Sequence, residues 1–513
     1  MKRSISRYIA PLLAAGIVVT ALAGCGNNVV SGTGTFELQQ NSSVSSEDTY
    51  PGEFPSADQS LPAGEGAALE ISSSSLMSSM EATSSESSSE AVTQSQAEDS
   101  SSRQPVTSTQ VVPQPEPVLP SSQAPVVSQP AASSEADQTA YTRPNNSVDE
   151  VRGIWISYLD FHAMARDQNR SSFTSNIDNA FSTIADYDLN TVFVQVRPFG
   201  DAMYESKIFP WSYILTGDEG IDPGYDPLEI MVTIAKKYDL RIEAWLNPYR
   251  VLAVGSTREL SSSNPAVQAI KKGKDTAISY NGGIFYNPAS NSARALITQG
   301  VVELVENYDI DGIHFDDYFY PTVDMAFDAN YYSDYCAQGG ELSQADWRRE
   351  NVNTLVRQVY AAVKAADPSV LFGISPQARM DNNYNGQFAD VEKWLSNSGY
   401  VDYICPQIYY GYDNAAAPYA STLALWSKMC RSSDVALYVG LAVYKCGVAD
   451  KWAGGGENEW INSTTMMRDM VEEARDASGY QGFLLYRYDS LFNPEHAVSS
   501  HIAKESANLK SVL

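Results

Sequence analysis

An apolar run ends abruptly at two acidic residues in the segment Asp311-Gly312-Ile313-His314-Phe315-Asp316-Asp317-Tyr318-Phe319-Tyr320-Pro321. Ile313 and Phe315 alternate with His314 and Asp316, which is the period of a β-strand with one apolar and one polar face. Adjacent carboxylates on a regular strand point to opposite faces, so both can serve one cleft only where the strand ends or twists. Because the pair falls at the predicted end of the strand, we expect both carboxylates in one cleft.

Seven further segments of strand length accompany this one, and helical periodicity lies between them. Apolar residues recur every three or four positions in 173–184, 228–238 and 347–363. Eight strand–helix units with nothing left over predict a closed (β/α)₈ barrel of the TIM type. An open, doubly wound sheet is the competing interpretation, although no Gly-rich phosphate loop follows the first strand. The eight predicted strands are Arg152–Asp160, Asn190–Pro198, Arg241–Tyr249, Asp311–Phe319, Leu371–Gln377, Val401–Tyr410, Ala436–Lys445 and Tyr480–Asp489.

Polar side chains interrupt these apolar strands near their C-terminal ends, where barrels of this type build their active sites. Alternation assigns these side chains to the inward face. Such a ring of polar groups indicates either a wet cleft or a buried hydrogen-bond network. The predicted ring consists of Gln195, Arg197, Glu243, Trp245, Asn247, His314, Asp316, Gln377, Gln407 and Tyr409.

The carboxylate pair at the end of the fourth strand has the residue types that glycoside hydrolysis requires. Crowded carboxylates in a half-dry pocket separate in pKa, so that one is protonated and the other is ionised. The alternative interpretation gives Asp316 a structural hydrogen bond and makes Asp317 a loop cap. A metal site is less favoured, because the chain has four histidines and no two of them lie at ligand spacing. We expect no cofactor.

The N-terminus has the pattern of an export signal. Basic residues precede an apolar run, Ile9 to Ala23, that is too short for a comfortable membrane span. The run ends in Leu22-Ala23-Gly24-Cys25, which resembles a bacterial lipobox. We therefore expect a lipoprotein signal peptide over residues 1–24 and a lipid anchor on Cys25, which would hold the protein outside the cytoplasm on the bacterial membrane.

A long Ser-, Pro- and Glu-rich segment follows the signal. It cannot bury enough apolar area to offset its ordering entropy, so residues 25–148 are predicted to be a disordered linker ahead of a folded domain over 149–513. The formal net charge of the chain is −28, and no basic block occurs outside the N-terminus. Nucleic acid is therefore excluded as a partner on electrostatic grounds. The remaining cysteines show no close spacing, and we expect free thiols at Cys336, Cys405, Cys430 and Cys446.

Six separated motifs, in order along the chain, resemble the bacterial glycosyl-hydrolase-like family ten. The resemblance implies a (β/α)₈ glycosidase, commonly a lipoprotein, in a family that includes a division-associated hydrolase of peptidoglycan glycan strands stripped of their stem peptides. It also implies that Asp316 and Asp317 are catalytic. Glu243 stands where the family frequently has His, so it is a third candidate carboxylate. The motifs are Arg152-Gly153-Ile154-Trp155-Ile156-Ser157, Gln195-Val196-Arg197-Pro198 with Asp201-Ala202, Ala244-Trp245-Leu246-Asn247-Pro248-Tyr249-Arg250, Gly312–Pro321, Ile374-Ser375-Pro376-Gln377 and Asp402-Tyr403-Ile404-Cys405-Pro406-Gln407-Ile408-Tyr409.

Roles for the candidate residues follow from this resemblance. Asp317 would protonate the glycosidic oxygen, Asp316 would orient water or the substrate's own 2-acetamido group, and Glu243 could replace either. Arg197 would either contact substrate or pair with Asp316. Amide and imidazole side chains would hold sugar hydroxyl and acetamido groups, and aromatic side chains would offer faces for sugar rings. The substrate-binding candidates are Gln195, Arg197, Trp245, Asn247, His314, Tyr318, Gln377, Gln407, Tyr409 and Tyr410.

The expected function is therefore cleavage of peptidoglycan glycan strands, or of a related N-acetylated glycan, at the cell surface. Two alternatives remain open at this point: a glycan-binding lipoprotein without turnover, and a glycosidase of another extracellular polysaccharide. Metalloprotease, serine-hydrolase and nucleotide chemistries lack their signatures, since the chain has no His-Glu-x-x-His, no Gly-x-Ser-x-Gly and no phosphate-cradling loop.

Overall fold

The structure is a computed structural model that describes residues 148–430 and 435–513. The predicted signal peptide, Cys25 and the linker up to residue 147 lie outside the described residues. No helix in the described part of the chain is both long enough and apolar enough to cross a bilayer.

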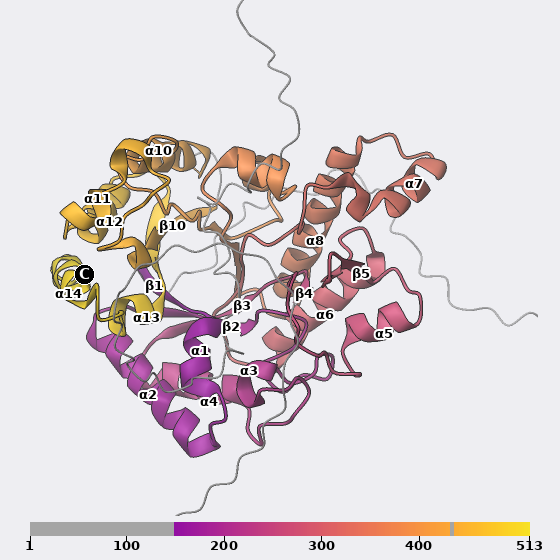
Figure 1. Ribbon diagram of the computed structural model, residues 1–513, viewed down its shortest axis with the longest axis horizontal. Helices are drawn as coiled ribbons and strands as arrows, with labels where there is room; N and C mark the ends of the chain where they lie inside the picture. The colour runs from indigo at the N-terminus through magenta and orange to yellow at the C-terminus, as the bar shows by residue number, and fades with distance from the viewer. Residues whose placement is uncertain (1–147, 431–434) are drawn as a thin grey trace, which may run out of the picture. The chain divides into compact units, whose positions relative to one another are not determined.

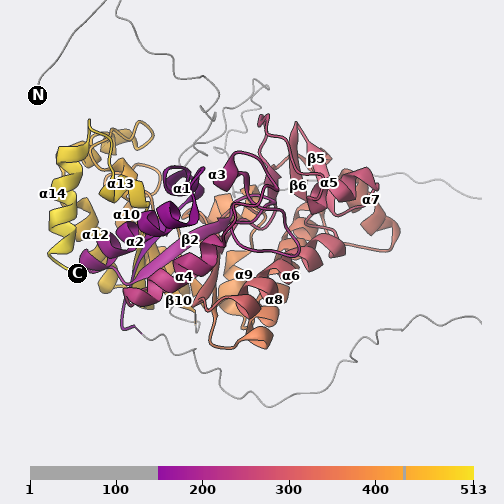
Figure 2. The same cartoon turned by 90° about the horizontal axis from the view of Figure 1, so that it is seen from below.

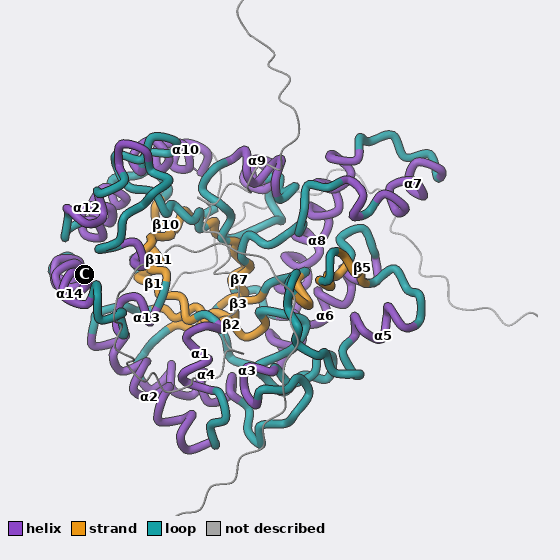
Figure 3. Tube along the Cα trace, in the orientation of Figure 1, coloured by secondary structure: helices purple, strands orange, loops and turns teal. Residues whose placement is uncertain are grey.

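Eight parallel strands close into a barrel in the order β1-β2-β3-β7-β8-β9-β10-β11, with β11 pairing back onto β1 (Figures 1 and 3). Each strand overlaps one of the eight predicted segments, and only β1 begins outside its segment, one residue earlier at Val151, so the predicted barrel is confirmed. The strands are shorter than predicted because the last residues of each segment already belong to the loops or short helices that follow the strands. The barrel strands are β1 (Val151–Ile156), β2 (Thr191–Arg197), β3 (Arg241–Leu246), β7 (Gly312–Phe315), β8 (Leu371–Ile374), β9 (Tyr403–Ile404), β10 (Ala436–Ala442) and β11 (Tyr480–Tyr486).

Helices surround the barrel, as the ring of purple helices around the orange strands in Figure 3 shows. The three helices that the sequence predicted, α2, α4 and α8, each begin at a residue whose side chain accepts a hydrogen bond from the backbone of the first turn. These capping residues are Asn169 for α2, Asp226, directly before Pro227, for α4, and Ser343 for α8. The α-helices are α1 (Tyr158–Ala165), α2 (Arg170–Asp186), α3 (Tyr213–Thr216), α4 (Pro227–Lys237), α5 (Pro265–Lys271), α6 (Asn291–Asn307), α7 (Ala329–Ala337), α8 (Gln344–Ala366), α9 (Val391–Ser396), α10 (Tyr419–Cys430), α11 (Glu459–Asn462), α12 (Met466–Arg475), α13 (Tyr488–Phe492) and α14 (Ser499–Lys510). Short 3₁₀ or π segments are η1 (Met325–Phe327), η2 (Asn382–Gly386), η3 (Val443–Lys445) and η4 (Gly454–Gly456).

A small antiparallel sheet interrupts the connection between β3 and β7, and it was not predicted. Its strands are β4 (Arg250–Leu252), β5 (Ala277–Tyr280) and β6 (Gly283–Tyr286), in the order β4-β6-β5. Figure 2 shows β5 and β6 beside α5 and α7, at the opposite end of the domain from α14. The dipeptide Asn281-Gly282 turns the β5–β6 hairpin with positive φ at both residues, 49° and 80°. Asn-Gly is a strong hairpin signal, so the sequence did hold this information.

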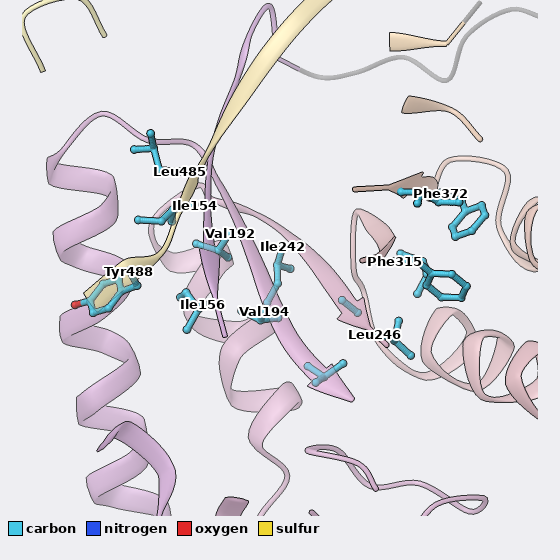
Figure 4. Close-up of a cluster of buried hydrophobic side chains, with 14 of the residues drawn as sticks. Ile154, Ile156, Val192, Val194, Ile242, Leu246, Phe315, Phe372, Leu485 and Tyr488 are labelled. Carbon is cyan, nitrogen blue, oxygen red and sulfur yellow. The ribbon is translucent and has the colours of Figure 1, made fainter. Parts of the chain in front are cut away.

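The hydrophobic core has two layers. The outward faces of the strands pack against the helices through aliphatic and aromatic side chains such as Val192, Ile242 and Phe315 (Figure 4). A separate cluster fills the barrel, with aromatic members such as Trp155 and Tyr403. A Cβ on Gly373 would lie 2.0 Å from the Tyr403 ring, so only glycine at this position admits that ring. The floor of the site is therefore aromatic and closely packed.

Candidate active site

A cavity of about 160 Å³ lies at the C-terminal ends of the barrel strands. Side chains from all eight barrel strands, or from the loops directly after them, line it. Aromatic and polar groups dominate the lining, which is typical of sites that bind sugars. The lining residues are Trp155, Tyr158, Leu159, Gln195, Trp245, Arg250, His314, Asp316, Asp317, Tyr318, Ser375, Gln407, Tyr409, Tyr444, Tyr486, Arg487 and Ser490.

Asp316 follows the last residue of β7, and three donors hold its carboxylate. Oδ2 accepts from Nε1 of Trp245 at 3.1 Å and from Nδ2 of Asn247 at 3.5 Å, and Oδ1 accepts from the backbone N–H of Tyr318 at 3.3 Å. Only 3% of Asp316 is exposed. Burial and the neighbouring Asp317 raise its pKa to about 7, against the opposing effects of Arg250 and Trp245.

Asp317 lies in the same cavity, so the end of β7 brings both carboxylates to one cleft, as the sequence pattern predicted. Oδ1 of Asp317 accepts from Nε2 of Gln407 at 3.2 Å, and the same Nε2 donates to the carbonyl oxygen of Ser375 at 3.1 Å. Burial raises the pKa of Asp317, and hydrogen bonds from Gln407 and Gln377 oppose the increase. With both pKa values raised, the pair holds a proton more readily than two isolated carboxylates would.

Arg250 is the cation beside this pair, and the sequence pattern did not single it out. Its guanidinium lies over the rings of Phe199 and Tyr318, 4.5 Å and 5.0 Å from their centroids. Its Nε donates to the carbonyl oxygen of Pro198 at 3.1 Å, and its backbone N–H donates to Oδ1 of Asn247 at 3.0 Å. These contacts hold a buried positive charge near Asp316, where it lowers the pKa of that carboxyl against burial and Asp317.

Arg197 was predicted to face the cleft, and this prediction is wrong. The pairing of β2 with β3 shifts register between Gln195 and Arg197, so two residues of β2 span a single step of β3. The extra residue inverts the alternation, and Arg197 points away from the cavity, with its guanidinium 4.6 Å from the ring centroid of Phe209. None of its guanidinium nitrogens has a hydrogen-bond partner among the described residues. Arg250 therefore takes the place beside Asp316 that was proposed for Arg197.

Glu243 lies inside the barrel beneath the cavity and does not line it. The Tyr403 hydroxyl donates to its Oε2 at 2.5 Å. The same Tyr403 hydroxyl oxygen lies 2.8 Å from Nδ1 of His314. On the other side of the imidazole ring, Nε2 of His314 accepts from Nε1 of Trp155 at 3.1 Å. Since an indole N–H only donates, the His314 proton sits on Nδ1, and the chain runs from Trp155 through His314 and Tyr403 to Glu243. Burial raises the pKa of Glu243 to about 7 and lowers the pKa of His314 to about 3. Glu243 thus supports the floor of the site and is not placed to contact a substrate.

The other predicted site residues divide into two groups. Gln195, Trp245, His314, Tyr318, Gln407 and Tyr409 line the cavity. Asn247, Gln377 and Tyr410 do not line it. Asn247 and Gln377 instead hydrogen bond to Asp316 and Asp317, respectively. Tyr410 follows Tyr409 and packs in the outer core layer, because neighbouring residues alternate in direction.

Several lining residues were missed by the sequence analysis. Trp155 follows from the same alternation, since Ile154 and Ile156 beside it face the helices. Tyr444, Tyr486, Arg487 and Ser490 come from the seventh and eighth strand ends, where no polar cluster pointed to the site. The aromatic rings of Tyr409 and Tyr486 lie 5.8 Å apart, so these late segments complete the aromatic wall.

The described residues contain no group of three or more His, Cys, Asp and Glu side chains arranged to hold a metal ion. No disulfide joins the four cysteines of this part of the chain, and burial raises the pKa of Cys405 and Cys446 well above the usual range. The arrangement can therefore supply proton transfer and charge stabilisation from the carboxylate pair, and ring contacts from the aromatic walls.

A (β/α)₈ barrel with two buried carboxylates in an aromatic cavity at its C-terminal face is the design of a glycoside hydrolase. The chain belongs to the glycosyl hydrolase-like 10 family, whose model matches residues 150–458. It is 33% identical to glycosyl hydrolase YngK of Bacillus subtilis over 63% of this chain, and spans 66% of the length of that protein. It is 33% identical to glycosyl hydrolase DigH of Escherichia coli over 68% of this chain and 85% of that protein. Among solved structures, it resembles the PgaB (BpsB) glycoside hydrolase domain from Bordetella bronchiseptica, with 13% identity over 69% of this chain and 98% of that one and a TM-score of 0.46.

Proposed function

We propose that this protein hydrolyses N-acetylated glycan strands of peptidoglycan from which the stem peptides have been removed. The observation that carries the proposal is the pair Asp316 and Asp317, two buried carboxylates with raised pKa in one aromatic cavity. Glycosidic bonds are cleaved by such pairs, in which one carboxyl group gives a proton to the leaving oxygen. The strictly peptide-free substrate is the part of the proposal that rests on the family resemblance.

Within the pair, Asp317 is the general acid and Asp316 orients the attacking group, either water or the 2-acetamido group of the substrate. Three donors hold Asp316 in one orientation, which suits a positioning and charge-stabilising role. Asp317 is the more exposed of the two, at 9%, and the side-chain amides of Gln407 and Gln377 donate to it. A carboxyl group that must reach a glycosidic oxygen needs such an accessible position.

The proposal is tested by incubating the full-length protein with peptide-free glycan strands, intact sacculi, chitin and starch-like glucans. We expect new reducing ends and soluble fragments from the peptide-free strands, identified by mass spectrometry. Asp316→Asn and Asp317→Asn should each abolish this release while leaving the melting temperature near that of the wild type. Full turnover by either variant would refute the assignment. Binding of the strands without new reducing ends would favour a non-catalytic glycan-binding protein.

The division of roles is tested with aryl glycosides that differ in the acidity of the leaving phenol. A good leaving group needs no protonation, so Asp317→Asn should regain turnover on the most acidic phenol, whereas Asp316→Asn should remain inactive on all of them. The opposite pattern would exchange the two roles.

We also propose that Cys25 carries a lipid anchor that keeps the hydrolase at the outer face of the membrane. Support comes from the segment Leu22-Ala23-Gly24-Cys25 after an apolar run. Metabolic labelling with a fatty acid should mark the wild-type protein and not Cys25→Ser. Equal labelling of both proteins would contradict the anchor.

A further inference from the structure

Arg487 lines the wall of the cavity that faces the carboxylate pair. It follows directly after β11, the eighth barrel strand, whereas Asp316 follows β7, the fourth. In a closed ring of eight strands, the fourth and the eighth lie on opposite sides. A sugar bound between them would therefore meet the carboxylate pair on one side and a guanidinium group on the other.

A buried carboxylate holds Arg487 in place. Nη1 of Arg487 donates to Oδ1 of Asp160 at 2.6 Å and to Oδ2 of Asp489 at 3.4 Å. Asp160 is fully buried, and it also accepts from the backbone and hydroxyl of Ser157 and from the backbone of Asp489. The guanidinium group is thus oriented before any ligand arrives, which reduces the entropy lost on binding.

The opposite edge of this guanidinium group is not used by the protein. Within residues 148–430 and 435–513, no acceptor is hydrogen bonded to Nε or Nη2 of Arg487, and its side chain is 20% exposed. The Nε–Nη2 edge of an arginine presents parallel N–H groups that match the two oxygens of a carboxylate. Ser490 lies three residues after Arg487, in α13, and also lines the cavity with its hydroxyl group available to a ligand.

We propose that Arg487 is a specificity-determining residue that binds the carboxylate of an acidic amino sugar, namely the lactyl carboxylate that muramic acid exposes once its stem peptide is removed. The inference rests on the proposed function, because it names a contact for the substrate of the same site. An attached stem peptide turns this carboxylate into an amide, which removes the charge that Arg487 would pair with. Selection for peptide-free strands would then come from one charge-assisted contact.

The net charge of the chain is opposite in sign to the guanidinium group of Arg487. At a formal −28, the protein as a whole repels carboxylates. Arg487 and Arg250 are the cationic side chains among the residues that line the cavity. Arg250 lies near Asp316 and is engaged by aromatic rings, which leaves Arg487 as the arginine of the opposite wall.

The test compares two forms of one substrate with the full-length wild type and Arg487→Gln. Peptide-free strands are used as they are, or after their carboxylates are converted to methylamides. We expect the wild type to prefer the carboxylate form, and Arg487→Gln to lose about 10- to 100-fold in kcat/KM on that form while changing less than about twofold on the amide form. Arg475→Gln is the matched control, because Arg475 also pairs with a carboxylate, Glu150, but does not line the cavity. An equal loss on both forms would assign Arg487 a structural role only and overturn the inference.

A binding measurement separates this inference from the proposed activity. If the wild type cleaves no glycan, the proposed function fails, and calorimetry with N-acetylmuramic acid and N-acetylglucosamine still decides the role of Arg487. Tighter binding of the acidic sugar by the wild type and equal binding of both sugars by Arg487→Gln would support the contact. Equal binding of both sugars by the wild type would overturn it, as would a preference for a uronic acid over the muramic acid. Arg487→Lys, which keeps the charge without the fork, should retain part of the preference.

Discussion

The hydroxyl of Tyr403 donates a hydrogen bond of 2.5 Å to Oε2 of Glu243, inside the barrel and below the cavity. This contact ends the chain that begins at Trp155 and passes through His314, two residues that do line the cavity. Glu243 therefore acts on the site through the aromatic floor. We therefore expect a positioning role for Glu243, in contrast to the catalytic roles proposed for Asp316 and Asp317.

The first prediction concerns the pH dependence of stability. Burial raises the pKa of Glu243 from 4.5 to about 7, so the folded protein holds this proton more tightly than the unfolded chain. Stability from this group is fully present below about pH 4.5 and is lost as pH rises through about 7. Glu243→Gln has no such carboxyl group and does not lose this stability. The free energy of unfolding of the variant minus that of the wild type should therefore increase by up to about 3 kcal/mol as the pH rises from 4.5 to 8. Denaturant unfolding across this range measures the difference. The exposed Glu392→Gln should give a curve parallel to the wild type, and a parallel curve for Glu243→Gln would contradict the prediction.

The second prediction concerns the same variant and catalysis. Glu243 does not line the cavity, and glutamine keeps an acceptor for the Tyr403 hydroxyl. Glu243→Gln should therefore retain hydrolysis within about tenfold of the wild type, whereas Glu243→Ala leaves a buried hydroxyl without its acceptor and should lose about 2 to 4 kcal/mol of stability. Complete loss of hydrolysis in a folded Glu243→Gln protein would restore Glu243 as a candidate catalytic carboxylate.

The third prediction concerns Trp245. Its indole donates to Oδ2 of Asp316 and so opposes the upward shift of the Asp316 pKa. Trp245→Phe removes this donor, so the pKa of Asp316 should rise, and the limb of the pH–rate profile that requires ionised Asp316 should move to higher pH. We expect about a tenfold lower kcat/KM at neutral pH. Trp394→Phe is the control, because it also removes a buried indole donor, to Asn353, but lies outside the cavity lining. The pH–rate profile of Trp394→Phe should match that of the wild type, and an equal shift in both variants would contradict the prediction.

The fourth prediction concerns the aromatic floor. A Cβ on Gly373 would lie 2.0 to 2.3 Å from three atoms of the Tyr403 ring, and that ring has no space to retreat inside the packed barrel. Gly373→Ala should therefore lower the free energy of unfolding by about 3 kcal/mol or more. Gly455→Ala meets nothing within 4 Å and should change stability little. Thermal unfolding of the two variants provides the comparison, and similar melting temperatures would show that the floor tolerates displacement of Tyr403.

The fifth prediction concerns thiol reactivity. Cys336 is exposed, whereas Cys405, Cys430 and Cys446 are buried. A maleimide applied to the native protein should label Cys336 and leave the three buried thiols unmodified, since reaction needs an accessible thiolate. Peptide mapping by mass spectrometry, before and after unfolding, identifies each site. Rapid labelling of Cys405 in the native protein would be inconsistent with a closed barrel interior.

Much of the fold and part of the site followed from the order of residues. Alternation along Gly312–Phe315 placed His314 and Asp316 inside the barrel, because a regular strand has a period of two. The same rule failed at Arg197, because one extra residue in β2 inverts the alternation. The residues Gln195-Val196-Arg197 carry no sequence signal that predicts this extra residue. Beyond the strand ends, Asn247 and Gln377 hydrogen bond to Asp316 and Asp317 but do not themselves line the cavity.

The sequence by itself determined the closed barrel, the position of the carboxylate pair at the end of the fourth strand and the family, because periodicity and local motifs are properties of neighbouring residues. Only the tertiary structure decided which cation faces Asp316 and which groups stand opposite it. Arg250 reaches the site from the first position of β4, in the small antiparallel sheet, and Arg487 reaches it from the position directly after the last strand, about 170 residues along the chain from Asp316. Such contacts depend on the closure of the barrel, which brings distant segments together and leaves no local signal in the sequence.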